Sequence, residues 1–306
     1  MGGGCYSADS FSSYAKSVGA VMTNSVVDGV KTVRLNNMKY SQTSLHSELD
    51  PKSRVRECCN TEEHPNTVPL ILALDVTGSM GSACDECAAS IANLMKELYE
   101  QFKDVEVCVM GVGDLECDDA PLQVSQFESD VRVAKQMQEI YLEKGGGGNS
   151  YESYTAPWYF GLYHTRLDCY DKQGRKGIII TMGDEPLNPA LNRRDVEHFL
   201  GVGLEEQTEV KTDKLYEAAS KKFDIYHITV QDDRTNYNSD RGSYEEGVDK
   251  SFKDVIGEDN YIVSSVNRLQ RNIVKCIEKS YKKRERLAED VAAPAEKKDD
   301  NAGLEW

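Results

Sequence analysis

Residues 75–80 (DVTGSM) place one carboxylate and two hydroxyl groups at alternating positions, directly after a strongly apolar stretch. In an extended turn, alternate side chains point to the same side, so the oxygens of Asp75, Thr77 and Ser79 can converge. A hard cation such as Mg²⁺ prefers oxygen ligands in octahedral array and usually retains several waters. We therefore expect a Mg²⁺ site here, with Mn²⁺ as an alternative ion.

The D-x-T-G-S-M pattern after a hydrophobic segment resembles the first loop of the metal-ion-dependent adhesion site of von Willebrand factor A (VWA) domains, whose common form is D-x-S-x-S. The Thr77 variant is similar to an intracellular branch that includes the domains attached to α-kinases. The resemblance covers about residues 68–265. It implies an α/β fold, three metal loops and a partner that binds through the ion.

The resemblance also identifies the other two loops. The second is residues 145–153 (GGGGNSYES), and the third is residues 183–186 (GDEP), where Asp184 matches the family's aspartate. The second loop departs from the family pattern. Either Asn149 or Ser150 stands where most members have threonine, and an acidic residue is common at the position of Asn149. The implied metal residues are thus Asp75, Thr77, Ser79, Asn149, Ser150 and Asp184.

Each motif also has a simpler interpretation. An Asp ahead of Thr or Ser is often only a helix N-cap, and a glycine run or a Gly-Asp-Glu-Pro segment is often only a loop or turn. Asp114 follows another apolar segment. The family resemblance implies that it shapes the site or holds a second cation, and the alternative is a solvated acidic loop. The combination of three loops in order favours a metal site.

The elements that must position these residues alternate between two periodicities. Residues 68–74, 105–112 and 177–182 are nearly continuous apolar runs, typical of strands buried on both faces. We expect an edge strand at 121–127 and further strands at 224–230 and 261–263. Amphipathic patterns predict helices at 83–102, 131–142, 152–170, 194–200, 212–222, 245–256 and 267–287. The prediction is a Rossmann-like, doubly wound α/β fold, with a mostly parallel central sheet and helices on both faces.

In such a sheet, ligands bind at the carboxyl ends of the strands where strand order reverses, so all three loops are expected there. We predict an irregular N-terminal extension over residues 1–66, with a short strand near 26–35. The VWA domain with its C-terminal helix is expected over 67–287, and a disordered charged tail over 288–306.

The chain carries 52 Asp and Glu against 36 Lys and Arg, a formal net charge of −16. This balance argues against binding to nucleic acids or anionic membranes, because both are polyanions. No apolar run approaches the ~20 residues that a membrane span needs. We expect no secretory signal and a cytoplasmic location.

Nine cysteines, an odd number, favour free thiols in a reducing compartment. Cys84 and Cys87 form C-x-x-C, and Cys58, Cys59 and His64 lie upstream, so a zinc site is an alternative to plain packing. A redox role for the C-x-x-C is a further alternative.

We expect a non-catalytic adaptor that binds a partner's Asp or Glu through the metal. Intracellular relatives often work in multiprotein assemblies with AAA-type ATPases. One alternative is a metal-dependent phosphoryl-transfer enzyme using Asp75, Asp114, Asp118 and Asp184. The other is a structural subunit of a larger particle.

Overall fold

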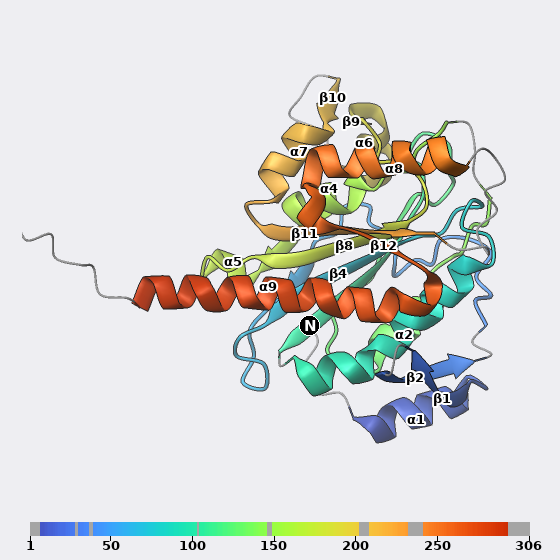
Figure 1. The fold of residues 1–306 in the computed structure, drawn as a ribbon, viewed down its shortest axis with the longest axis vertical. Helices are drawn as coiled ribbons and strands as arrows, with labels where there is room; N and C mark the ends of the chain where they lie inside the picture. Colours follow the sequence, from blue (N-terminus) through green and yellow to red (C-terminus); the bar gives the residue numbers. More distant parts are fainter. Residues whose placement is uncertain are drawn as a thin grey trace, which may run out of the picture.

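The computed structural model describes residues 7–27, 30–36, 39–102, 104–145, 149–201, 208–231 and 241–292. Its centre is a six-stranded sheet with the order β12-β11-β8-β4-β5-β6. Figure 1 labels β12, β11, β8 and β4 of this sheet. The strands are β4 (Val68–Asp75), β5 (Val105–Val112), β6 (Leu122–Val124), β8 (Gly177–Gly183), β11 (Phe223–Val230) and β12 (Tyr261–Ser264). Neighbouring strands pair in parallel, except that β6 is antiparallel to β5 at one edge. This arrangement confirms the predicted Rossmann-like fold class.

Strand β4 lies in the middle of the sheet and pairs with β5 on one side and with β8 on the other. The chain passes from β4 to β5 on one side and later returns to β8 on the other. All residues of β4, β5 and β8 are buried. Because successive side chains of a strand point to opposite faces, Leu70, Leu72 and Leu74 pack in one core, while Ile71 and Ala73 pack in the other.

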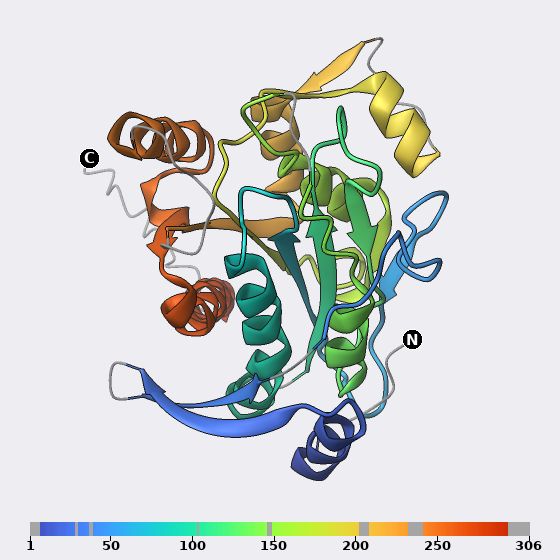
Figure 2. The same cartoon turned by 90° about the vertical axis from the view of Figure 1, so that its right-hand side faces the viewer.

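Helices cover both faces of the sheet, as the two views in Figures 1 and 2 show. The first core is covered by α1 (Ala8–Ser17), α2 (Ala83–Gln101), α3 (Arg132–Glu139) and α9 (Leu269–Ala292). The second core is covered by α4 (Thr155–Tyr163), α6 (Arg193–Leu200), α7 (Thr212–Ala219) and α8 (Arg241–Ile256). The two cores are therefore separated by the sheet itself.

The helix predicted at 152–170 is shorter in the structure. Helix α4 ends at Tyr163 and is followed by β7 (Thr165–Leu167) and the short α5 (Asp168–Asp171). Strand β7 pairs in parallel with β3 (Arg56–Cys58), so a long-range pairing overrides the local helical pattern. The Thr165 hydroxyl also donates to the carbonyl oxygen of Gly161 at 2.5 Å, at the end of α4.

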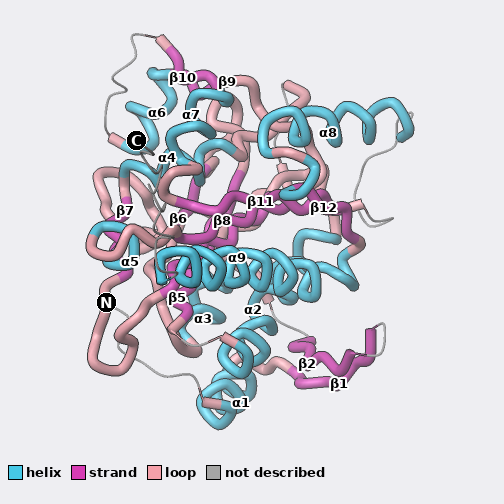
Figure 3. The backbone as a smooth tube through the Cα atoms, turned by 60° about the vertical axis from the view of Figure 1, so that its left-hand side comes forward, coloured by secondary structure: helices cyan, strands magenta, loops and turns pink. Residues whose placement is uncertain are grey.

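The N-terminal segment is more regular than predicted. It contains α1 and an antiparallel hairpin of β1 (Val21–Val27) and β2 (Val30–Asn36), which lies apart from the main sheet (Figure 3). The side chain of Ser7 accepts a hydrogen bond from the Ser10 amide and so caps α1. The prediction of a single strand at 26–35 was therefore wrong, because this range includes the end of β1 and most of β2.

The remaining elements are small. Strands β9 (Ala190–Asn192) and β10 (Glu209–Lys211) pair antiparallel, and two 3₁₀ turns, η1 (Glu258–Asn260) and η2 (Val266–Arg268), flank β12. Helix α9 continues to Ala292, past its predicted end, and residues 293–306 of the predicted tail lie outside the described residues. Within the described ranges, none of the helices has the length and apolarity to cross a membrane.

Candidate metal centre

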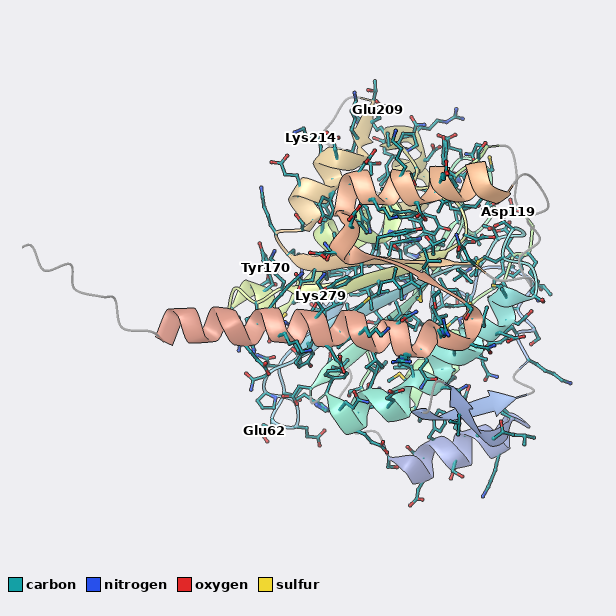
Figure 4. All side chains as sticks on the ribbon, in the orientation of Figure 1. Glu62, Asp119, Tyr170, Glu209, Lys214 and Lys279 are labelled. Carbon is teal, nitrogen blue, oxygen red and sulfur yellow. The ribbon has the colours of Figure 1, made fainter. Side chains whose placement is uncertain are left out.

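Two carboxylates meet at the carboxyl ends of the two central strands. Asp75 is the last residue of β4, and Asp184 directly follows β8, the parallel neighbour of β4. Strand order reverses between these strands, which is where open α/β sheets bind ligands. Figure 4 shows which end of the sheet this is. Asp119, in the turn after the carboxyl end of β5, lies on the right, and Tyr170, ahead of the amino end of β8, lies on the left.

Asp75 is fully buried, and both of its oxygens have protein partners. Its Oδ1 accepts from the Thr77 amide at 2.9 Å and from the Thr77 hydroxyl at 2.6 Å. Its Oδ2 accepts from the Tyr154 hydroxyl at 2.5 Å. The Asp75 carboxylate therefore holds Thr77 in place. It would act on an ion indirectly, through the Thr77 hydroxyl or through a water molecule.

Ser79 joins the first loop to the third. Its Oγ donates to Asp184 Oδ1 at 2.8 Å and lies 3.2 Å from Thr77 Oγ1. Asp184 is only 8% exposed, and its Oδ2 is buried without a hydrogen-bond partner in the described part of the chain. The structure thus brings Asp75, Thr77, Ser79 and Asp184 into one continuous hydrogen-bonded group.

The two candidates of the second loop lie differently from that group. Asn149 lines the same pocket as Thr77 and Ser79, but its Nδ2 donates to Asp114 Oδ2. Ser150 is exposed, and the described lining of the pocket does not include it. The loop is fixed to the first loop through the backbone: the Gly78 amide donates to Gly145 O at 2.6 Å.

Glu152 is a residue that the sequence did not single out. It is 8% exposed, it lines the pocket, and its Oε2 is buried with no partner among the described residues. Burial, and then the nearby charge of Asp75, raise the pKa of Glu152 to about 11. Its position three residues after Asn149 in the same loop was the available signal, but only the fold reveals that it turns inward.

The pocket between these loops has a volume of about 220 Å³. Besides the residues above, it is lined by Gly78, Asp114, Lys144, Tyr151 and Glu185. Burial raises the pKa of Asp75 to about 6, in spite of the hydrogen bonds from Thr77 and Tyr154. Burial, and then the charge of Asp75, raise the pKa of Asp184 to about 8.

These observations fit a hard divalent cation. Buried carboxylates that repel one another and have unpartnered oxygens are costly unless a cation compensates them. Over the described ranges, no three His, Cys, Asp or Glu side chains converge as a cluster able to hold a metal. Hydroxyl groups and waters would therefore complete the shell, as Mg²⁺ prefers.

Asp114 belongs to the support of the second loop. Its Oδ1 accepts from the Ser153 hydroxyl at 3.2 Å and from the Glu116 amide at 3.1 Å, and its Oδ2 accepts from Asn149. Both oxygens are engaged, so the geometry favours the site-shaping alternative over a second cation.

The cysteines do not assemble in the way that the zinc alternative requires. Cys84 and Cys87 are buried in the first core, whereas Cys58 is buried in the second, across the sheet. All eight cysteines in the described part of the chain are free thiols. Cys5 lies outside the described residues.

Comparisons with known proteins give similarities of chain trace alone. No family model and no curated protein matches the sequence. The pilus adhesin SpaC from Lactobacillus rhamnosus GG is 11% identical over 85% of this chain, with a TM-score of 0.47; this chain spans 33% of its length. The protein BatB from Bacteroides thetaiotaomicron is 18% identical over 70% of this chain and 99% of its own, with a TM-score of 0.43.

A third solved structure is the vWF domain of the type V pili tip protein Mfa5 from Porphyromonas gingivalis. It is 11% identical, over 69% of this chain and 95% of its own, with a TM-score of 0.45.

Proposed function

We propose that this chain is a Mg²⁺-dependent protein-binding module of the VWA type. In this proposal Thr77, Ser79 and Asp184 hold Mg²⁺ or Mn²⁺, with Asp75 positioning Thr77 and Glu152 facing the ion from the second loop. A partner's Asp or Glu completes the coordination. The observation that carries the proposal is the buried Oδ2 of Asp184 beside Ser79, which has no hydrogen-bond partner among the described residues and lies where strand order reverses.

The charges around the pocket favour binding over phosphoryl transfer. Phosphoryl chemistry needs basic groups that neutralise the transferred phosphate. Among the described residues of the pocket lining, Lys144 is the only basic one, and its Nζ is held by Asp85 Oδ2 at 2.6 Å. We therefore propose a binding module in preference to a phosphoryl-transfer enzyme.

The ion also resolves an electrostatic conflict. A chain with a net charge of −16 repels an acidic partner at long range, and a divalent cation at the pocket would attract a carboxylate there. The net charge equally disfavours nucleic acids and anionic membranes as partners. We place the module in a cytoplasmic assembly, for which an AAA-type ATPase complex is the first candidate. The free thiols support a reducing compartment.

The test combines metal titration with partner capture. Mg²⁺ and Mn²⁺ are titrated by calorimetry into the wild type, Asp75→Ala and Asp119→Asn. Asp119 is an exposed carboxylate at the same edge of the sheet, so its variant controls for loss of one negative charge. Saturable binding that is lost only in Asp75→Ala supports the site.

Partner capture from lysate is then compared with Mg²⁺ and with chelator. Release by chelator supports the metal-bridged partner. Capture that ignores chelator, together with concentration-dependent self-assembly, would instead support the structural-subunit alternative.

A further inference from the structure

One side chain joins the first metal loop to the third. Tyr154 is the N-cap residue of α4, directly after the second loop, and it is fully buried. Its hydroxyl donates to Asp75 Oδ2 in the first loop at 2.5 Å. The same oxygen accepts a long hydrogen bond, 3.4 Å, from the Glu185 amide in the third loop. A tyrosine hydroxyl can donate one hydrogen bond and can also accept, so it makes both of these contacts at once.

The backbone of β8 leaves room for this hydroxyl at Gly183. A Cβ atom at that position would lie 1.9 Å from the Tyr154 hydroxyl and 2.7 Å from Asp75 Oδ2. Any side chain here would therefore separate the two groups. The glycine ahead of Asp184 is needed for this contact and not only for a turn.

The tyrosine ring is held from the other side by aromatic packing. Its centroid lies 5.0 Å from that of His227, edge to face, and 5.6 Å from that of Phe252. His227 in turn stacks on Phe252 at 3.5 Å with an interplanar angle of 10°. These three buried rings come from α4, β11 and α8, and they fix the direction in which the hydroxyl points.

We propose that Tyr154 is the positioning residue of the metal centre, and that it acts through Asp75. Its hydroxyl occupies Asp75 Oδ2, so the carboxylate is oriented with Oδ1 toward the amide and hydroxyl of Thr77. Thr77 then donates inward and presents its remaining lone pairs to the ion. This inference rests on the proposed function for its effect on metal binding, but the contact between the loops exists without the metal.

The test is Tyr154→Phe, which removes a single oxygen and keeps the packed ring. Tyr226→Phe is the matched control, because Tyr226 is also buried and its hydroxyl lies 2.9 Å from Ser280 Oγ in the other core. Near-ultraviolet circular dichroism verifies that both variants keep the fold. Gly183→Ala is a second variant, which displaces the hydroxyl without deleting it.

The first readout is amide hydrogen exchange without metal. We expect faster exchange at Thr77 and Glu185 in Tyr154→Phe, because their acceptors are moved or lost, and no change in Tyr226→Phe. The second readout is Mg²⁺ affinity by calorimetry, which should fall about 10- to 100-fold, as for other partners that orient metal ligands. The third is the electron paramagnetic resonance spectrum of bound Mn²⁺, which a loss of general stability would not alter.

Unchanged exchange at both amides, or an equal loss of affinity in Tyr226→Phe, would overturn the proposal. Wild-type protein that binds neither Mg²⁺ nor Mn²⁺ would end the proposed function, and the exchange comparison would still decide whether Tyr154 joins the loops. Metal binding by the wild type with equal affinity in Tyr154→Phe would end the positioning role alone.

Discussion

The two ends of helix α4 bury charged groups in opposite ways. At its C-terminal end, Lys222 is 6% exposed, and its Nζ donates to Leu162 O at 3.1 Å and to Thr165 O at 2.8 Å. Carbonyl groups at a helix C-terminus favour a cation, so this charge is accommodated by the fold itself. Burial still lowers the pKa of Lys222.

At the N-terminal end of the same helix, carboxylates are buried with incomplete hydrogen bonding to the described part of the protein. Asp184 Oδ2 and Glu152 Oε2 have no partner within the described residues, and the pKa of each is raised by burial and by Asp75. A buried charge whose hydrogen bonds are complete contributes to the structure, whereas an incomplete one that lines a pocket beside other carboxylates is a candidate ligand for a cation. Under the proposed function, Lys222 is a structural charge, whereas Asp184 and Glu152 face the ion.

The sharpest test of the contrast is Asp184→Asn. We expect Mg²⁺ affinity to fall by more than about 100-fold, beyond the range for outer partners of a ligand, because a charged ligand is lost. The free energy of unfolding of the metal-free protein should stay equal or rise, because one of two repelling carboxylates is neutralised. Calorimetry and urea unfolding measure the two quantities. A variant that loses stability but keeps its metal affinity would place Asp184 with the structural charges.

The pH dependence of metal-free stability comes next. Burial raises the pKa of Asp75 from 3.8 to about 6 and that of Asp184 from 3.8 to about 8, so between these values the folded state binds more protons than the unfolded state. The free energy of unfolding must therefore fall as pH rises through this window. Burial also raises the pKa of Glu152 to about 11, which acts in the same direction, so we expect the free energy of unfolding of the metal-free protein to decrease between pH 5 and 8.

Saturating Mg²⁺ should remove most of that loss, because it compensates the ionised carboxylates. Urea unfolding at four pH values, with and without Mg²⁺, makes the comparison. Metal-free stability that increases from pH 5 to 8 would contradict it.

Lys222→Met tests the structural end of α4. The carbonyl oxygens of Leu162 and Thr165 would lose their buried donor, which should lower the free energy of unfolding by about 1 to 2 kcal/mol. Mg²⁺ affinity should not change, because the site is at the other end of the helix. Lys221→Met, at the exposed neighbour, is the control for charge. A coupled loss of metal affinity would mean that the two ends do not act independently.

The smallest effect is expected at Lys144→Met. Lys144 pairs with Asp85 at 2.6 Å, but the two side chains are 48% and 40% exposed, so the pair should contribute less than about 1 kcal/mol. Unfolding measured at low and high salt should show little difference between the variant and the wild type. A larger loss would show that this pair holds the second loop in place.

The predictable part of the molecule follows from local patterns. Apolar runs indicate β4, β5 and β8, and their alternation with helices indicates the doubly wound sheet. In such sheets the loops after parallel strands meet at one edge, so the proximity of Asp75 and Asp184 could be predicted from the sequence.

The parts that were missed depend on distant contacts. The end of α4 at Tyr163 results from the pairing of β7 with β3, about a hundred residues away in the chain. The burial of Glu152 and the hydrogen bond from Tyr154 to Asp75 depend on how the second loop packs against the sheet. The spacing of residues in the sequence does not reveal this packing. Helix α1 did have a local signal, the Ser7 cap, within a segment that was too polar to read as regular.

The order of strands along the chain has a consequence for synthesis on the ribosome. The central strand β4 emerges first, and the sheet then grows outward, to β5 and β6 on one side and to β8, β11 and β12 on the other. Asp75 and Asp184 come together only after β8 has paired with β4, and this pairing does not involve β11 or β12. Under the proposed function, an ion would join the first and third loops once β8 has paired with β4, and it would then favour docking of the later strands.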